Sequence, residues 1–235
     1  MDISNSKYFD LWAKEYTDLP DERSFHLNYT GKLITKKYNL NINKKGLDVV
    51  DLGIGNGRFL SALNCTFSRM VGIDSSKEQL ALARKNLQEK NKYLEVIQCD
   101  LEKAILLKDQ SMDLVISNAT VHHIKNKTRL FQEVYRTLRP KGAFVFFDFY
   151  FEDTNREMLK NTLSKQAKSP LISRKFISSI KKEYDLMPEH LEKNHPHEYH
   201  ESPGSLVKSL ESIGFKNCEI IPTFYSKYLG VGCIK

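Results

Sequence analysis

A glycine-rich loop with an acid at its entrance is the first place in this sequence where chemistry can be expected. The stretch VVDLGIGNGRF, residues 49–59, carries Asp51 and then Gly53, Gly55 and Gly57 at every second position. Glycines after a buried strand let backbone N–H groups approach a ligand closely. A carboxylate beside them repels a phosphate but attracts a cation. The loop therefore predicts a ligand with a positively charged end, the other interpretation being a plain tight turn.

The spacing of this loop differs from two common nucleotide-binding loops. A nicotinamide or flavin fingerprint reads G-x-G-x-x-G, and Arg58 stands where its third glycine should fall. No Gly-Lys-Ser/Thr follows, so the loop is not a phosphate-binding P-loop. An oxidoreductase that uses a nicotinamide cofactor is therefore disfavoured.

Two more carboxylates end the next apolar runs. Asp74 follows RMVGI, about 20 residues after the glycines, where an acid is placed to accept hydrogen bonds from two ribose hydroxyls. Asp100 follows YLEVIQC, and a carboxylate there can accept from an adenine amino group. Since the carboxyl ends of parallel strands meet at one edge of a sheet, we expect these acids and Asp51 to line one crevice. A ligand with a cationic end, a ribose and an adenine suits them, and S-adenosylmethionine has all three parts.

A series of motifs in the chain resembles those of the class I S-adenosylmethionine-dependent methyltransferases, in particular the small-molecule type. VVDLGIGNGRF is similar to their first motif, D/E-x-G-x-G-x-G, and VGIDSS, VIQCDLE and MDLVISNATVHHI are similar to the next three. RTLRPKGAFVFFDF is similar to their R-x-L-x-P-G-G segment, with Lys141 in place of the first of the two glycines. SLVKSLESIGFKNCEI resembles their C-terminal helix and strand. The resemblance covers roughly residues 45–150 and 203–235.

The elements that must position these residues alternate between strand and helix. Short apolar runs and helical segments follow one another from Leu47 onward, which predicts an α/β fold with a mostly parallel sheet and helices on both faces. NCEIIPTF and SKYLGVGCIK predict an antiparallel hairpin at the sheet edge. The resemblance implies a doubly wound seven-stranded sheet with strand order 3-2-1-4-5-7-6 and an antiparallel strand seven.

The length of the chain suits a single domain, residues 1–235. We expect residues 1–46 to form a helical lid and residues 47–150 the cofactor-binding core. Residues 151–203 are a basic, His-rich and helical insertion that we expect to cover the substrate. Residues 204–235 complete the domain with a helix and a strand hairpin.

The resemblance also implies roles for individual residues. The glycine loop lies under the methionine part of the cofactor, Asp51 contacts its ammonium end through water, and Asn118 faces the sulfonium. Trp12 and Tyr16 can cover the cofactor, although ordinary helix packing explains them equally well. The predicted cofactor-binding residues are Trp12, Tyr16, Asp51, Gly53, Gly55, Gly57, Asp74, Ser75, Asp100, Leu101 and Asn118.

The residues after the fourth strand bear on the reaction. Methyl transfer from a sulfonium needs alignment and exclusion of water more than a catalytic triad, and the sequence shows no triad. The stretch SNAT, residues 117–120, lacks the N/D-P-P-Y/F pattern typical of methylation at base amino groups. His123 is the candidate general base and His122 a candidate substrate contact; the other interpretation is a packing pair.

Histidines gather at the end of the predicted insertion. Four of the seven histidines of the chain fall within EHLEKNHPHEYH. A His-x-His pair can bind zinc, but no cysteine accompanies it and the spacing matches no metal template, so no metal is predicted. The candidate substrate contacts here are His195, His197, Tyr199 and His200, and a solvated loop is the alternative.

The positive charge of the chain is concentrated in the insertion. Segment 156–182 has eight Lys or Arg against one acid, and the whole chain carries a net charge of +7. A solvated helix face explains this, as does an anionic acceptor. We therefore expect methyl transfer to O, N or C of a small molecule, an anionic one if the basic segment binds it. The alternatives are an RNA methyltransferase, against which no separate RNA-binding domain is visible, and a non-catalytic S-adenosylmethionine-binding regulator.

Composition and the distribution of apolar residues and cysteines indicate where in the cell the protein is expected. The chain is 40% hydrophobic and 28% charged, which is typical of a globular domain, and no apolar run approaches the ~20 residues that a membrane span needs. The N-terminal residues MDISNSKYFDLW do not resemble a secretory signal. The four cysteines are scattered and read as reduced thiols. We expect a cytoplasmic protein, and the sequence leaves its oligomeric state open.

Overall fold

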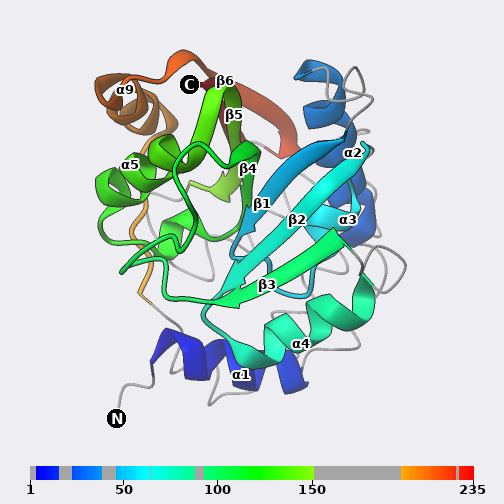
Figure 1. Ribbon diagram of the computed structural model, residues 1–235. Coiled ribbons are helices and arrows are strands. Elements are labelled where there is room, and N and C mark those ends of the chain that lie inside the picture. Colours follow the sequence, from blue (N-terminus) through cyan, green and yellow to red (C-terminus); the bar gives the residue numbers. More distant parts are fainter. Residues whose placement is uncertain are drawn as a thin grey trace.

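A seven-stranded sheet with helices on both faces forms the centre of the computed structural model (Figure 1). The strands are β1 Leu47–Leu52, β2 Phe67–Asp74, β3 Leu94–Gln98, β4 Met112–Asn118, β5 Leu138–Phe149, β6 Lys216–Tyr225 and β7 Tyr228–Ile234. The structure describes residues 4–15, 23–38, 46–63, 65–87, 93–150, 197–225 and 228–235.

The strand order is β3-β2-β1-β4-β5-β7-β6. Neighbouring strands from β3 to β5 are parallel, whereas β7 is antiparallel to both β5 and β6. The predicted order, the antiparallel strand seven and the edge hairpin are therefore confirmed. The central strands read as nearly continuous apolar runs because both of their faces are covered by helices.

The helices are α1 Asn5–Glu15, α2 Arg23–Lys37, α3 Arg58–Ser61, α4 Lys77–Asn86, α5 Lys127–Thr137 and α9 Pro203–Ile213, with a short 3₁₀ turn at Val121–His123. Side chains of α2, α3 and α4 pack with Val49, Leu114 and Val145 on one face of the sheet. Side chains of α5 and α9 pack on the other face. This two-sided packing is the doubly wound arrangement that the alternation of elements predicts.

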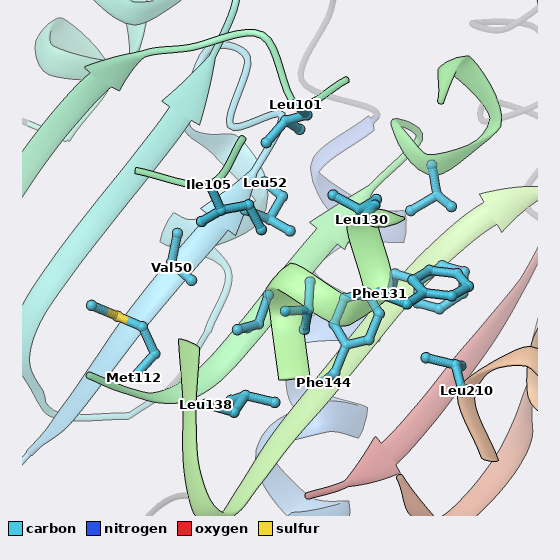
Figure 2. Packing of buried hydrophobic residues seen from close by; sticks show 14 of the residues in the cluster. Val50, Leu52, Leu101, Ile105, Met112, Leu130, Phe131, Leu138, Phe144 and Leu210 are labelled. Carbon is cyan, nitrogen blue, oxygen red and sulfur yellow. The ribbon is translucent and has the colours of Figure 1, made fainter. Parts of the chain in front are cut away.

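Figure 2 shows the second of these cores, in which Leu130 and Phe131 of α5 lie over the sheet. Phe144 of β5 and Leu210 of α9 join the same cluster, and Phe131 and Phe144 are fully buried. Burial of a large apolar side chain stabilises the fold by about 1.5–3 kcal/mol. The core therefore fixes the strands whose carboxyl ends carry the predicted site.

Helix termini follow from local sequence. Ser76 caps α4 by accepting a hydrogen bond from the Gln79 N–H at 3.1 Å. Ser202 caps α9 in the same way, and Gly214 ends this helix with a φ of 120°. Lys141 adopts a φ of 70°, the left-handed conformation that glycine adopts without strain. The motif that this segment resembles carries a glycine at the same position, which suits this conformation.

Gly31 lets α2 approach α3 closely. A Cβ atom added at Gly31 would lie 2.3 Å from the Ala62 carbonyl oxygen, a backbone atom that cannot move aside easily. We expect Gly31→Ala to lower the free energy of unfolding by about 1–3 kcal/mol in urea titrations, because overpacking shifts the backbone. Gly204→Ala is the matched control, since a Cβ there meets nothing within 4 Å. Equal stability of the two variants would contradict the close approach.

No helix in the described part of the chain is long and apolar enough to cross a membrane. The domain limits, the lid role of residues 1–46 and the cytoplasmic location stay predictions. The basic segment 156–182 lies outside the described residues.

Candidate functional site

The glycine loop connects β1 to α3 in a conformation that favours glycine. Gly53, Gly55 and Gly57 have φ values of 71°, 52° and 83°, in the left-handed region. A Cβ at Gly53 would also lie 2.1 Å from the Thr120 hydroxyl oxygen. The loop is therefore held against the segment that follows β4, and its tight path leaves no room for side chains at Gly53.

Asp74, at the end of β2, is tied to this loop. Its Oδ2 accepts a hydrogen bond from the Gly55 N–H and its Oδ1 accepts one from the Ser76 N–H, both at 2.9 Å. Burial raises the pKa of Asp74, and these backbone donors oppose the rise by stabilising the ionised form. A carboxylate oxygen can accept more than one hydrogen bond. Asp74 is therefore oriented by the backbone and still able to accept from two hydroxyl groups.

Asp51, in β1, is a buried carboxylate whose oxygens accept no hydrogen bond from the described residues. It is 1% exposed, and among the described residues neither of its oxygens has a hydrogen-bond partner. Burial raises its pKa well above the usual range and the charge of Asp74 raises it further, while the Leu60 N–H opposes this without reaching hydrogen-bond geometry. Buried carboxylates are normally hydrogen-bonded or paired. The position therefore suits a ligand that brings a cation or a donor.

Gln79 provides a second unused acceptor beside the loop. Its Oε1 atom is buried without a hydrogen-bond partner in the described part of the chain, and it is the nearest atom to a Cβ built at Gly55, at 3.7 Å. Gln79 lies in the first turn of α4. A glutamine inside a helical pattern carries no signal of its own, so Gln79 could not be predicted from the sequence.

Asp100 and Leu101 follow β3 at the same edge of the sheet. The Cys99 N–H donates to the Asp74 carbonyl at 2.9 Å, which joins the ends of β2 and β3. Asp100 is exposed and Leu101 is buried. The Ser75 carbonyl, beside them, accepts from the Gln98 side chain at 3.1 Å. The three aspartates predicted to share one crevice thus lie at the ends of three neighbouring strands.

Asn118 ends β4 and is held by a residue that the sequence analysis missed. The Tyr228 hydroxyl donates to the Asn118 Oδ1. Tyr228 is 2% exposed, and burial raises its pKa well above the usual value, so the phenol stays protonated and can donate at neutral pH. The Thr120 hydroxyl donates to the Asn118 carbonyl at 3.1 Å. The amide of Asn118 is therefore fixed in one orientation.

His122 forms a buried pair with Asp148 of β5, a second residue that the sequence analysis missed. The His122 N–H donates to Asp148 Oδ2 at 2.9 Å, and the ring Nδ1 contacts Asp148 Oδ1. Asp148 is 1% exposed and also accepts from the Phe149 N–H at 2.8 Å. Burial lowers the pKa of His122, but the carboxylates of Asp148 and Glu198 outweigh it, so the net shift is upward. The ring is thus held in one orientation, with Nδ1 toward Asp148 and Nε2 on the far side, 3.8 Å from Glu198 Oε1.

Glu198 connects this pair to His200. The His200 Nε2 lies 2.8 Å from Glu198 Oε2 and its Nδ1 lies 3.0 Å from the Phe149 carbonyl oxygen. A carbonyl oxygen only accepts, so Nδ1 carries a proton. The second contact then needs another proton, either on the ring or on the carboxyl group of Glu198. The rings of His200 and His122 stack with their centroids 5.6 Å apart, so both histidines belong to one cluster of titratable side chains.

His123, the predicted base, is half-buried between this cluster and α1. Its ring lies 3.9 Å from the His122 ring and 5.4 Å from the Phe9 ring, centroid to centroid. Its backbone N–H donates to the Thr120 carbonyl at 3.0 Å. The structure therefore places His123 beside the N-terminal helix and next to a histidine whose position is fixed.

The other predicted substrate contacts differ in placement. The Tyr199 N–H donates to the His122 carbonyl at 2.6 Å, and its ring lies 4.4 Å from the ring of the exposed His197. The Tyr199 carbonyl accepts from the buried Lys127 ammonium, which also donates to the Ile124 carbonyl. Segment 197–200 is thereby fastened to the residues after β4. Tyr16 and His195 lie outside the described residues, and Trp12 is half-buried on α1.

The chain is similar to known methyltransferases. A family model described as a methyltransferase domain matches residues 50–146. An arsenite methyltransferase of Aquipseudomonas alcaligenes is 32% identical over 45% of this chain, which spans only 33% of that protein's length. The ubiquinone biosynthesis O-methyltransferase of Vibrio atlanticus is 24% identical over 94% of this chain and 81% of its own.

One solved structure extends the likeness to the whole fold. A crystal structure of a putative S-adenosyl-L-methionine-dependent methyltransferase from Methanococcus maripaludis covers 100% of this chain and 97% of its own, with a TM-score of 0.64 at 19% identity. At this identity the match shows the shared fold.

Proposed function

Because the chain belongs to the class I S-adenosyl-L-methionine-dependent methyltransferases, we propose that it transfers a methyl group from this cofactor to O, N or C of a small molecule. The observation that carries the proposal is the buried carboxylate of Asp51, which has no partner among the described residues and sits at the entrance of the glycine loop. An ammonium group next to Asp51 offsets the desolvation cost of the buried carboxylate and supplies the hydrogen-bond donors that its oxygens lack.

The residues at the strand ends fit the parts of this cofactor. We assign the ammonium end to Asp51 and the ribose hydroxyls to Asp74, whose oxygens are oriented by backbone donors. Gly53, Gly55 and Gly57 provide the close backbone approach. The adenine falls to Asp100 and Leu101, with Ser75, Trp12 and Tyr16 as further contacts; these assignments rest on the resemblance and on the placement of the described residues.

Methyl transfer mainly requires the protein to align the acceptor atom with the methyl group of the cofactor. When bound, S-adenosyl-L-methionine supplies a methyl group on a positively charged sulfur, which is a good leaving group. We assign the reacting end of the cofactor to Asn118, whose side chain is held by Tyr228. His123 can take a proton from an acceptor that does not lose it at neutral pH. We propose that the buried pair of His122 and Asp148 supports His123 by fixing the neighbouring ring.

A small-molecule acceptor agrees with the names of the two relatives, one of which acts on arsenite and the other in ubiquinone biosynthesis. The proposal that the acceptor is anionic rests on the basic segment 156–182. The contacts of the acceptor with His122, His197, Tyr199 and His200 stay predictions. The predicted contact with His195 does so as well.

The first test of this function is a ligand-dependent rise in melting temperature. We expect S-adenosylmethionine and S-adenosylhomocysteine, but not NAD, to stabilise the pure protein, because a ligand at 100 times its Kd adds about 2.7 kcal/mol to the free energy of unfolding. Thermal unfolding with each ligand and with buffer alone measures this. A rise with NAD only would sink the proposal, and a rise with the two sulfur compounds would justify screening acceptors for S-adenosylhomocysteine release.

A further inference from the structure

Helix α1 is attached to α4 through a carboxylate that the proposed function does not use. Asp10 Oδ1 accepts a hydrogen bond from the Ser76 hydroxyl at 2.6 Å and one from the Glu78 N–H at 3.2 Å. The first N–H groups of a helix have no partner within the helix. Asp10 therefore supplies a cap to α4 from a distant part of the chain, and the two helices lie side by side (Figure 1).

Ser76 passes this attachment on to the cofactor site. Its hydroxyl accepts from the Gln79 N–H at 3.1 Å while donating its single proton to Asp10. Its backbone N–H donates to Asp74 Oδ1, and the other oxygen of Asp74 holds the Gly55 N–H. Ser76 is 0% exposed, so no water replaces these partners. One continuous hydrogen-bonded path thus runs from α1 through the proposed ribose acid to the glycine loop.

The carboxylate of Asp10 has one favourable electrostatic neighbour, the N-terminus of α4, and one unfavourable neighbour, the carboxylate of Asp74. A helix N-terminus favours a negative charge, which compensates for placing the carboxylate of Asp10 near that of Asp74. A second contact between the same helices, the ion pair of Lys14 with Glu78 at 3.6 Å, is exposed and contributes little. The polar attachment of α1 to this end of α4 therefore rests on Asp10 and on the Ser6 hydroxyl, which donates to the Ser75 carbonyl at 2.8 Å, while burial of Tyr8 and Ala13 adds apolar contacts.

The same helix reaches the other half of the site. Tyr8 of α1 is 2% exposed, and Phe9 packs its ring edge-to-face with the His123 ring. Helix α1 thus contacts α4, which follows the end of β2, and the turn that follows β4. A displacement of α1 changes both the proposed ribose contact and the surroundings of the proposed base.

We propose that Asp10 is a positioning residue for the cofactor: it holds α1 against the N-terminus of α4 and, through Ser76, keeps Asp74 in the orientation that accepts the ribose. This inference rests on the proposed function. Since the path is built from hydrogen bonds to Asp10 Oδ1, an amide oxygen at the same place preserves it, whereas a methyl group breaks it.

Titration calorimetry with S-adenosylhomocysteine tests the inference on the full chain. We expect Asp10→Ala to raise the Kd about tenfold, the equivalent of one hydrogen bond to a charged group, and Asp10→Asn to stay within about threefold of the wild type. Lys14→Ala is the matched control in the same interface and should bind like the wild type. Asp10→Ala that binds as tightly as the wild type overturns the inference, as does an equal loss in Asp10→Ala and Asp10→Asn.

Hydrogen exchange on the wild type keeps the test decisive if Asp10→Ala does not fold. We expect S-adenosylhomocysteine to slow amide exchange in α1, because the ligand stabilises the path that holds this helix. Unchanged exchange in α1 while the ligand is bound overturns the role of Asp10 but leaves the proposed function standing. A wild type that binds neither S-adenosylhomocysteine nor S-adenosylmethionine overturns the proposed function, and this inference with it.

Discussion

Replacing Asp74 by alanine is expected to weaken S-adenosylhomocysteine binding by at least about 100-fold. Two hydrogen bonds from ribose hydroxyls to an ionised carboxylate are worth about 1.5–3 kcal/mol each, and the alanine removes both acceptors. The change also frees the Gly55 and Ser76 N–H groups, which lose the partner that orients the loop. Titration calorimetry on the folded variant, with circular dichroism to verify the fold, measures the loss.

Glu95→Gln is the control for this experiment. Glu95 is also an acid near β2, on the adjacent strand β3, but it faces solvent and pairs with Arg69 at 2.5 Å. Its replacement should leave the Kd for S-adenosylhomocysteine unchanged. An Asp74→Ala protein with an intact fold and wild-type affinity would show that the ribose is held elsewhere.

Replacing Asp148 by alanine is expected to lower the free energy of unfolding by about 3–5 kcal/mol, because breaking a buried charge pair leaves the other charge uncompensated. Asp148 is the acceptor for the His122 N–H, the His122 ring and the Phe149 N–H, all in a buried position. Urea unfolding near pH 6 measures the loss. Asp109→Ala is the control: Asp109 pairs with Arg136 on the surface, and its removal should cost no more than about 1 kcal/mol.

The pH dependence of this loss of stability shows whether His122 is protonated in the folded protein. The pKa of His122 is raised in the folded state, since Asp148 and Glu198 outweigh the effects of burial and of the nearby Lys127 ammonium. A raised pKa means that the stabilisation is fully present below the unfolded value of about 6.5 and disappears as pH rises through the folded value. The difference between wild type and Asp148→Ala should therefore shrink between pH 6 and alkaline pH. A constant difference over that range would mean that His122 is neutral in the folded protein.

The helices and strands, and the acids that end the strands, could be predicted because their signals are local. The apolar runs, the caps at Ser76 and Ser202 and the glycines at positive φ are each decided by residues a few positions apart. Asp51 and Asp74 could be assigned to one crevice because the ends of parallel strands meet at one edge, whatever their register. The strand order, in contrast, came from the resemblance to a family, since no periodicity in one chain states which strands are neighbours.

The remaining site residues were decided by tertiary structure alone. Asp148 meets His122 because β4 and β5 are neighbours in register, and Tyr228 reaches Asn118 across 110 positions because β7 returns beside β5. Asp10 caps a helix 66 positions away. Nothing in the local sequence distinguishes these residues from ordinary surface or core side chains. The sequence by itself determined which elements form and which acids end their strands, because those depend on burial patterns within each segment. Which side chains share a proton, and which carboxylate is left without a partner, depends on distances between segments, and only packing sets those.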